Sequence, residues 1–425
     1  MNSLTGKKLL VLGGSSSNVQ LVRFAQSMGA YVYVADNQDN RPGKRIADRP
    51  VMISTDDYDS LSAFIMKEHI DGVATGAGEW NVVNAMRLSR IAGLPYYATE
   101  ELWGICQDKR HFKSCCKRFN VPTVPDFSLT NLPGAADCPV IVKPVDGCSS
   151  RGINICHNFE DLKIAIDAVR RISDSEDLII EKYITNGGVT IDAKYVVVDG
   201  VFYLEAIGER YVLNNGLITA ISFYPSKYYD LFVRQVHPFV KPMFEALGYR
   251  NGVFFFQAIP EGDRIYVYEM GLRVSGGMIY NMTEACGCNN AMKMLIYHSL
   301  TGKMCEEDDL RMIDPLFHGK KATTIALPLR LGTISSVYGI DDIRRQKDVV
   351  DVTVYYGCGH KCIPDHLNTL DQLFARVMIV SDTEEELVSA LQMVRNSVSV
   401  RNELGEDLLI WDTFDSLMKS RLIIK

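Results

Sequence analysis

The first hundred residues alternate short apolar runs with segments that repeat apolar residues every three or four positions. The apolar runs cover residues 8–12, 31–35 and 72–75, and the helical spacing covers residues 19–28, 61–68 and 81–92. Alternating strands and helices predict a parallel, doubly wound α/β sheet. Ligands bind such sheets at the carboxyl ends of the strands, which here carry Gly13, Gly14, Ser15, Asp36 and Gly76.

From about residue 98 the pattern changes to longer helices and paired strands. The expected elements are one helix over 99–119, buried strands over 139–144 and 178–184, and a helix over 159–172 between them. Two antiparallel hairpins are expected over 189–207 and 252–270, because Asp-Gly and Glu-Gly turns divide them. Beyond residue 320 we expect strands over 323–328, 350–356 and 374–380 and a helix over 383–395. The pattern predicts a doubly wound domain followed by a region of α+β structure.

Composition narrows the class of protein. The chain has 425 residues, of which 47% are hydrophobic and 23% charged, as in a soluble globular protein of about three domains. No apolar run reaches the roughly 18 residues of a membrane helix, and the first apolar run is too short for a secretory signal. The net charge is −7, whereas proteins that bind nucleic-acid backbones are normally basic. We therefore expect a cytoplasmic protein without membrane or nucleic-acid partners.

Four short motifs suggest chemistry that their context does not favour. Cys-Gly-Cys at 286–288 and Cys-Gly-His-Lys-Cys at 358–362 lack the C-x2-C spacing of zinc ribbons, so we interpret them as free thiols. Residues 291–294 match the biotinyl-lysine tetrapeptide around Lys293, but the surrounding text has helical spacing. The loop after residue 12 lacks the third glycine of a dinucleotide fingerprint, although Asp36 fits its acid, so a nicotinamide oxidoreductase is a minor alternative.

Six side chains suited to phosphate or metal chemistry follow one another between residues 109 and 273. They are Lys109 in a helix, Lys143 and Glu181 near the ends of two buried strands, Gln257 and Glu269 on paired strands, and Arg273. A lysine at the end of a buried strand needs water or an anion, and buried carboxylates are rare unless paired or metal-bound.

Together these residues indicate a site for a nucleoside triphosphate. Two lysines can neutralise phosphate charge, and a Gly/Ser loop after Lys143 can donate backbone N–H groups. The oxygens of Gln257 and Glu269 suit Mg²⁺, and Arg273 can stabilise negative charge that develops during phosphoryl transfer.

This ordered set resembles the ATP-grasp superfamily, in particular biotin carboxylase, the large subunit of carbamoyl-phosphate synthase and the L-amino acid ligases. The resemblance covers nearly the whole chain and implies a doubly wound pre-ATP-grasp domain, a two-lobed ATP-grasp fold and a C-terminal α+β subdomain. The implied boundaries are 1–97 for the first domain, 98–185 for the N-terminal part with the lid lobe, 186–318 for the C-terminal lobe with the metal site, and 319–425 for the last subdomain.

The resemblance implies a role for each residue that matches a family motif. The residues implied to bind ATP are Lys109, Lys143, the lid residues Gly147, Ser149, Ser150 and Gly152, and the adenine hinge Glu181, Lys182, Tyr183 and Ile184. Gln257 and Glu269 match the two metal-ligand positions, and Arg273 matches the catalytic arginine at the acyl phosphate. Ser275, Gly276 and Gly277 resemble the substrate-binding stretch of amino acid ligases, with Arg210 and Tyr211 as weaker candidates for substrate contact.

One departure from the family pattern concerns the metal site. The family segment E-x-N-x-R reads Glu-Met-Gly-Leu-Arg at 269–273, so Gly271 supplies no side chain where an asparagine is usual. The resemblance implies an ATP- and Mg²⁺- (or Mn²⁺-) dependent ligase that joins a small-molecule carboxylate to an amine through an acyl phosphate, and members of the superfamily commonly form homodimers. The alternatives are a bicarbonate-activating enzyme like biotin carboxylase or carbamoyl-phosphate synthase, and a non-catalytic ATP-binding homologue.

Overall fold

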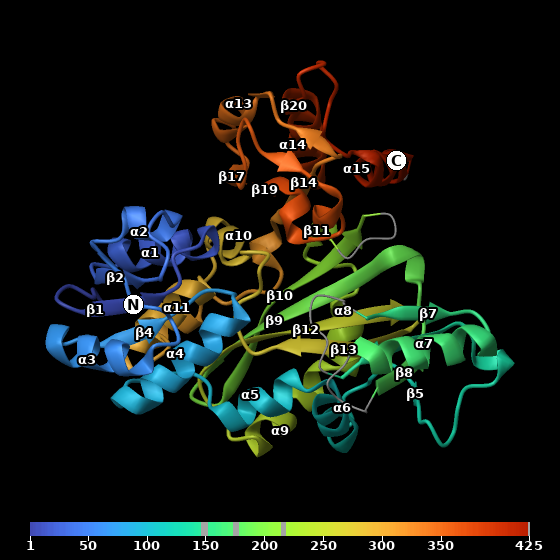
Figure 1. Ribbon diagram of the computed structural model, residues 1–425, viewed down its shortest axis with the longest axis horizontal. Helices are drawn as coiled ribbons and strands as arrows, with labels where there is room; N and C mark the ends of the chain where they lie inside the picture. The colour runs from blue at the N-terminus through green and yellow to red at the C-terminus, as the bar shows by residue number, and fades with distance from the viewer. Residues whose placement is uncertain (146–151, 173–177, 214–217, 424–425) are drawn as a thin grey trace.

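The computed structural model describes residues 1–145, 152–172, 178–213 and 218–423. Figure 1 shows the N-terminal domain at the left, a small antiparallel lobe at the right, and the C-terminal elements at the top, all attached to a long central sheet. Within the described residues, none of the helices has the length and apolar character that crossing a bilayer requires.

The N-terminal domain is the parallel sheet that the sequence predicted. Its strand order is β3-β2-β1-β4, and every pairing is parallel. The strands are β1 (Lys8–Leu12), β2 (Tyr31–Ala35), β3 (Arg49–Val51) and β4 (Gly72–Ala74), and the helices are α1 (Val19–Ser27), α2 (Pro42–Ile46), α3 (Tyr58–Glu68) and α4 (Glu79–Ala92). Parallel strands buried on both faces explain why the first two runs are almost wholly apolar.

The prediction of a single helix over 99–119 is wrong. The chain forms two helices there, α5 (Glu100–Gln107) and α6 (Lys109–Arg118). Asp108 separates them in an extended conformation, and its carboxylate accepts hydrogen bonds from the N–H groups of Arg110 and His111. Aspartate stabilises a helix start in this way, so the break places Lys109 at the first position of α6 rather than inside a helix. Thr99 caps α5, so the first helix begins where the predicted helix was expected to begin.

The antiparallel lobe has four strands in the order β5-β8-β6-β7. They are β5 (Asp126–Phe127), β6 (Val140–Pro144), β7 (Asn154–Cys156) and β8 (Leu178–Lys182). Helix α7 (Phe159–Ile172) covers one face through Leu162 and Val169, which pack against Val142 and Ile180. Because side chains alternate along a strand, Lys143, Ile179 and Glu181 point to the opposite face, toward α6.

The central sheet has eight strands in the order β13-β12-β9-β10-β11-β14-β19-β17. Their bounds are β9 (Val189–Val198), β10 (Val201–Val212), β11 (Thr219–Tyr224), β12 (Gly252–Glu261), β13 (Arg264–Gly271), β14 (Lys321–Pro328), β17 (Val349–Val354) and β19 (Leu373–Ser381). Helices α8 (Tyr229–Gln235) and α9 (His237–Ala246) cover one face, while α10 (Tyr280–Ala285) and α11 (Ala291–Thr301) cover the other. β11 pairs with β14, so the expected division at 318/319 falls between two hydrogen-bonded strands.

The C-terminal elements pack on the far end of this sheet (Figure 1). They are β15 (Gly332–Thr333), β16 (Ser336–Tyr338), α13 (Ile340–Arg344), β18 (Lys361–Cys362), α14 (Glu384–Ser397), β20 (Ser399–Arg401) and α15 (Asp412–Ile423). The short helix α12 (Glu307–Leu310) lies instead beside the N-terminus, where the Met1 amino group pairs with Asp309. Thr383 and Glu386 form the capping box at the start of α14, in agreement with the predicted helix start.

Candidate active site

A buried carboxylate links α6 to the antiparallel lobe. Glu181 is 4% exposed, and its two oxygens lie 2.6 Å from Lys113 Nζ and 2.6 Å from Lys143 Nζ. Burial lowers the pKa of Lys113, although the neighbouring Glu181 carboxylate opposes that shift. Lys113 is absent from the predicted site, and its signal was its position one helical turn after Lys109, on the same face of α6.

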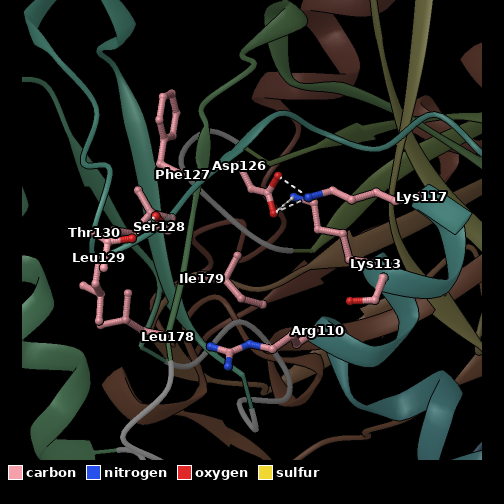
Figure 2. Close-up of a pocket in the computed structure, with 12 residues that line it drawn as sticks. Arg110, Lys113, Lys117, Asp126, Phe127, Ser128, Leu129, Thr130, Leu178 and Ile179 are labelled. Carbon is pink, nitrogen blue, oxygen red and sulfur yellow. Dashed lines mark hydrogen bonds and ion pairs between the residues drawn. The ribbon is translucent and has the colours of Figure 1, made fainter.

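The predicted phosphate-binding lysines lie together at this point. Lys109, Lys143 and Glu181 line one narrow cavity with Tyr268 of β13, so the cavity joins the antiparallel lobe to the central sheet. A larger cavity of about 420 Å³ adjoins it, because Lys113 lines both. Figure 2 shows this larger cavity between α6 and β5, with Lys117 bonded to the Asp126 carboxylate at 2.7 and 2.8 Å.

The predicted adenine hinge runs from Glu181 to Ile184 at the end of β8. Lys182 Nζ pairs with the Glu261 carboxylate at 2.7 and 2.9 Å, which ties the hinge to the β12–β13 turn. The N–H of Lys182 donates to Pro125 O and the N–H of Tyr183 donates to Pro139 O. Because those two N–H groups are engaged, the Lys182 carbonyl and the Ile184 N–H are the hinge backbone groups that we expect to contact adenine.

The predicted lid is described only at its end. Gly147, Ser149 and Ser150 lie outside the described residues. Gly152 has φ +75°, and a Cβ there would lie 2.5 Å from the Ile172 side chain, so glycine is required at this position.

A row of three oxygen-bearing side chains crosses the central sheet. Asp192 of β9 lies opposite Gln257 of β12, which lies opposite Glu269 of β13. Directly paired residues of antiparallel strands share a face, so the three side chains lie side by side. Carboxylate and amide oxygens are suitable ligands for Mg²⁺, which keeps several waters and substrate phosphates in its shell. These donors fit that ion with no need of a fourth protein ligand.

Asp192 was not among the predicted metal ligands, because strand pairing across sixty residues cannot be read from spacing alone. Its carboxylate lies 2.7 Å from Lys194 Nζ, and Tyr224 OH donates to it at 3.2 Å. Gln257 Oε1 accepts a hydrogen bond from Tyr268 OH at 2.8 Å. Hydrogen bonds thus hold the Asp192 and Gln257 side chains in place, whereas Glu269 is exposed.

Arg210 lies on the same face of the sheet and is not a surface residue. Its guanidinium bonds to Thr219 Oγ1 at 2.8 and 3.0 Å, while its Nη1 is buried without a hydrogen-bond partner in the described part of the chain. Burial disfavours its charge, but the nearby Tyr268 and Asp192 keep its pKa above the ordinary value. Tyr211 packs edge-on against Phe223 on the opposite face, so the structure separates the two candidates.

Arg273, the predicted catalytic arginine, joins the N-terminal domain to the central sheet. Its Nη2 lies 2.9 Å from Glu79 Oε1, and its guanidinium lies 5.3 Å from the centre of the Phe255 ring. Gly271 lies opposite Phe255, and a Cβ at Gly271 would come within 2.4 Å of that ring. Phe255 therefore takes the space that an asparagine at 271 would need, which accounts physically for the departure from the family pattern.

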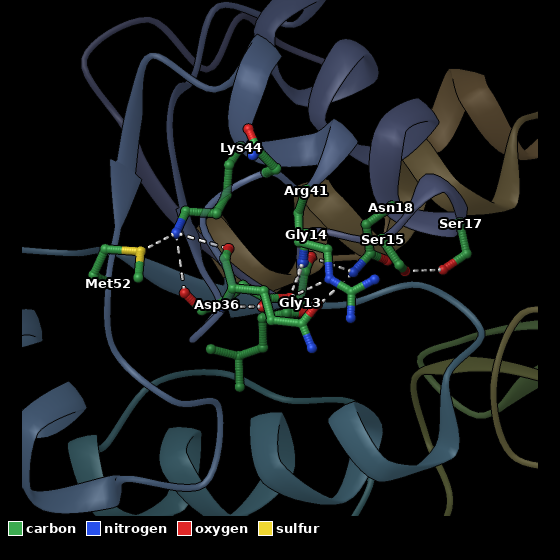
Figure 3. Close-up of polar contacts among 12 residues, drawn as sticks. Gly13, Gly14, Ser15, Ser17, Asn18, Asp36, Arg41, Lys44 and Met52 are labelled. Atoms are coloured by element: carbon green, nitrogen blue, oxygen red, sulfur yellow. Dashed lines mark hydrogen bonds and ion pairs between the residues drawn. The ribbon is translucent and has the colours of Figure 1, made fainter.

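The glycine-rich loop of the N-terminal domain is held by its own side chains (Figure 3). Asp36 accepts hydrogen bonds from the N–H groups of Gly14 and Gln38, both at 2.8 Å. Asn18 donates to the carbonyls of Leu12 and Gly13. Both carboxylate oxygens of Asp36 are thus engaged with the backbone, whereas a dinucleotide site needs that acid to reach a ribose.

The structure also describes the tetrapeptide around Lys293 and the two cysteine motifs at 286–288 and 358–362. Lys293 lies inside α11, as the helical spacing predicted, and pairs with Glu284. In the described ranges, no three His, Cys, Asp or Glu side chains converge in a geometry that holds a metal ion.

The sequence is similar to one family model and to several known proteins. The family model "D-ala D-ala ligase C-terminus" matches residues 122–228. The formate-dependent phosphoribosylglycinamide formyltransferase of Methanocaldococcus jannaschii is 25% identical over 65% of this chain and 72% of its own.

Two solved structures extend the likeness over most of the chain. Phosphoribosylglycinamide synthetase from Anaerococcus prevotii has a TM-score of 0.74 and 17% identity, covering 93% of this chain and 100% of its own. L-amino acid ligase from Bacillus licheniformis has a TM-score of 0.74 and 17% identity, covering 94% of this chain and 100% of its own. The fold is thus that of ATP-grasp structures, as the sequence resemblance implied.

Proposed function

We propose that the protein is an ATP- and Mg²⁺-dependent ligase that joins a carboxylate to an amine through an acyl phosphate. The observation that carries this proposal is the narrow cavity where Lys109, Lys143 and Glu181 meet Tyr268 of β13. Tyr268 bonds to Gln257, so the lysines stand beside the oxygen row of the central sheet. Tyr268 therefore connects the cationic groups to the proposed metal ligands, and phosphoryl transfer uses both.

The reaction needs no side-chain nucleophile. A substrate carboxylate oxygen bonds to the γ-phosphorus of ATP as the bond to ADP breaks, and the amine then attacks the acyl carbon and releases phosphate. In this proposal Lys109 and Lys143 hold phosphate oxygens, and Arg273 faces the charge that develops on the transferred group. Glu79 orients Arg273 through the 2.9 Å contact.

Asp192, Gln257 and Glu269 are the residues that would hold Mg²⁺, which supplies charge neutralisation at the phosphates. In this proposal Lys143, whose Nζ lies 2.6 Å from Glu181 in this structure, turns from that carboxylate toward phosphate when nucleotide binds. Lys113 then keeps Glu181 paired, so the buried carboxylate never loses both partners.

The first test is phosphate release from Mg·ATP with a panel of acids and amines, singly and in pairs. Release that needs one acid plus one amine supports the ligase and identifies its substrates. Release with bicarbonate alone would replace the ligase by the bicarbonate-activating alternative. Lys143→Met is the control that must abolish release, and Lys163→Met, at an exposed helix position, is the matched variant that must not.

The non-catalytic alternative needs a separate test. ATP binding by calorimetry without turnover in any mixture would support it. Gly271→Asn alone is a poor reversion because Phe255 occupies the space, so Gly271→Asn combined with Phe255→Ala is the better variant. The proposal also implies a cytoplasmic enzyme of small molecules and a homodimer, which sedimentation velocity would test.

A further inference from the structure

The C-terminal part of the sheet brings a second arginine to the predicted substrate segment. Arg376 lies on β19 and is 9% exposed. Its Nη1 donates to Gly276 O at 3.2 Å, a contact that spans one hundred residues of sequence. Its Nε is buried and has no hydrogen-bond partner among the described residues. Arg376 therefore reaches the segment after Arg273 with donors still unused.

Ser275 presents another unused donor to the same place. Its hydroxyl is buried and likewise lacks a partner in the described ranges. A Cβ added at Gly277 would lie 3.7 Å from Ser275 Oγ and 3.8 Å from Arg376 Nη1, with no other described non-adjacent heavy atom within 4 Å. One small space beside Gly277 is thus flanked by a hydroxyl and a guanidinium from two distant parts of the chain.

The charges around this space leave Arg376 without a carboxylate partner. The described part of the chain gives Arg376 no ion pair within 4 Å. Asp351 on the neighbouring strand β17 instead accepts a hydrogen bond from Thr353. A buried guanidinium is destabilising unless an anion pairs with it, and its planar fork suits carboxylate or phosphate oxygens.

We propose that Arg376 and Ser275 bind a second acidic group of the substrate, a carboxylate or phosphate that is not the one activated. The inference rests on the proposed function, because Arg273 marks where the activated carboxylate lies. Ser275 follows Arg273 by two residues, at most about 7 Å along the backbone. That separation suits a small acid with two anionic groups. Because Arg376 belongs to β19, this strand would contribute to the choice of acid.

The competing interpretation is that Arg376 only fastens the Gly276 carbonyl to the C-terminal strands. Gly277→Ala separates the two interpretations. Its methyl group fills the space beside Ser275 at ordinary contact distances and leaves the bond from Arg376 to Gly276 O intact. Gly357→Ala is the matched control, because a Cβ at that exposed glycine meets no described atom within 4 Å.

The test measures thermal unfolding with succinate, inorganic phosphate or acetate, in the absence of ATP. We expect succinate or phosphate, but not acetate, to raise the Tm of wild type and Gly357→Ala and to leave Gly277→Ala unchanged. Succinate or phosphate as the stronger ligand identifies the acidic group. A Tm that none of the anions raises, or an equal rise in Gly277→Ala, would overturn the proposal. Failure of the protein to bind ATP would sink the proposed function while leaving this anion result standing.

Turnover gives a second readout once the acid is known. Arg376→Lys keeps the charge and loses the fork, so KM for the acid should rise about tenfold while kcat changes less than about threefold. An unchanged KM with a lowered Tm would show that Arg376 is structural, which contradicts the proposal.

Discussion

The candidate site has two halves, which differ in how fully their polar groups are paired. One half lies between α6 and the antiparallel lobe, and the other lies around Arg273 and the segment that follows it. In the antiparallel lobe, Glu181 engages Lys113 and Lys143, and Lys117 engages Asp126. On the substrate side, Arg210 Nη1, Arg273 Nε, Ser275 Oγ and Arg376 Nε are buried without hydrogen-bond partners among the described residues. The first half is complete without a ligand, and the second has unused donors.

This difference implies that a ligand would bind to the two halves in different ways. Under the proposed function, a nucleotide in the first half competes with ion pairs that are already present, so part of its binding energy replaces those contacts. An anionic substrate in the second half meets donors that need no partner to be removed first, which is a preorganised arrangement. Substitutions should therefore affect stability mainly in the first half and substrate binding or turnover mainly in the second.

The largest expected effect is on the stability of the paired half. Glu181→Ala leaves two nearly buried lysines without their carboxylate, and such a change costs about 4 kcal/mol of unfolding free energy. Urea denaturation measures it. Glu160→Ala, in the exposed pair with Lys163, is the matched control and should change stability by less than about 0.5 kcal/mol. Equal effects of the two substitutions would show that the Glu181 cluster is not a buried network.

Substitutions in the half with unused donors should affect turnover. Arg273→Ala removes a donor from the proposed transition state, so kcat should fall about 10²- to 10³-fold, or about 3 kcal/mol, with ATP affinity retained. Steady-state phosphate release and equilibrium ATP binding measure the two quantities. Glu79→Gln, which weakens only the orientation of Arg273, should give a smaller loss of kcat. Loss of ATP binding in Arg273→Ala would assign this arginine to the nucleotide half instead.

A third prediction concerns Glu205, which is 4% exposed and interacts with Lys194. Burial raises its pKa to about 7 from 4.5. Between these values the unfolded chain loses the proton and the folded chain keeps it, so this group lowers stability as pH rises from about 4.5 to about 7.

Removing the charge of Glu205 should therefore remove that pH dependence. Glu205→Gln should match wild type near pH 4 and exceed it by about 3 kcal/mol at pH 8. Urea unfolding at a series of pH values measures the difference. A variant less stable than wild type at pH 8 would show that Lys194 depends on the ionised carboxylate.

The smallest effect is expected at the hinge. Lys182 and Glu261 pair through side chains that are 42% and 38% exposed, so Lys182→Ala should cost about 0.5 kcal/mol or less. ATP affinity should change less than about threefold, because the proposed adenine contacts there are backbone groups. Calorimetry decides this, and a tenfold loss of affinity would give the Lys182 side chain a direct role in nucleotide binding.

Sequence periodicity predicted the elements well where local forces decide them. The strand over 8–12 and the helix over 159–172 have the predicted bounds, because their apolar faces match their periods. The predicted helix over 99–119 failed at Asp108, where a side chain that hydrogen-bonds to the backbone outweighs helical spacing.

Only the site residues that occur in the order of the family motifs could be predicted from the sequence. Lys109, Lys143, Glu181, Gln257, Glu269 and Arg273 could be placed in sequence order, and their roles stay predictions. Asp192 and Arg376 could not, since the first joins the row through strand register and the second reaches Gly276 from another part of the sheet. Long-range register depends on how whole strands pair, which residue spacing does not encode.

The hydrogen bonds between β11 and β14 have a practical consequence for dissecting the protein. A fragment ending at residue 318 would present β11 as a bare strand edge with unpaired N–H and carbonyl groups. Such an edge recruits strands from other molecules, so the fragment should aggregate even though every predicted nucleotide residue is present. Shortened versions for crystallisation or screening are better trimmed inside surface loops than at that boundary.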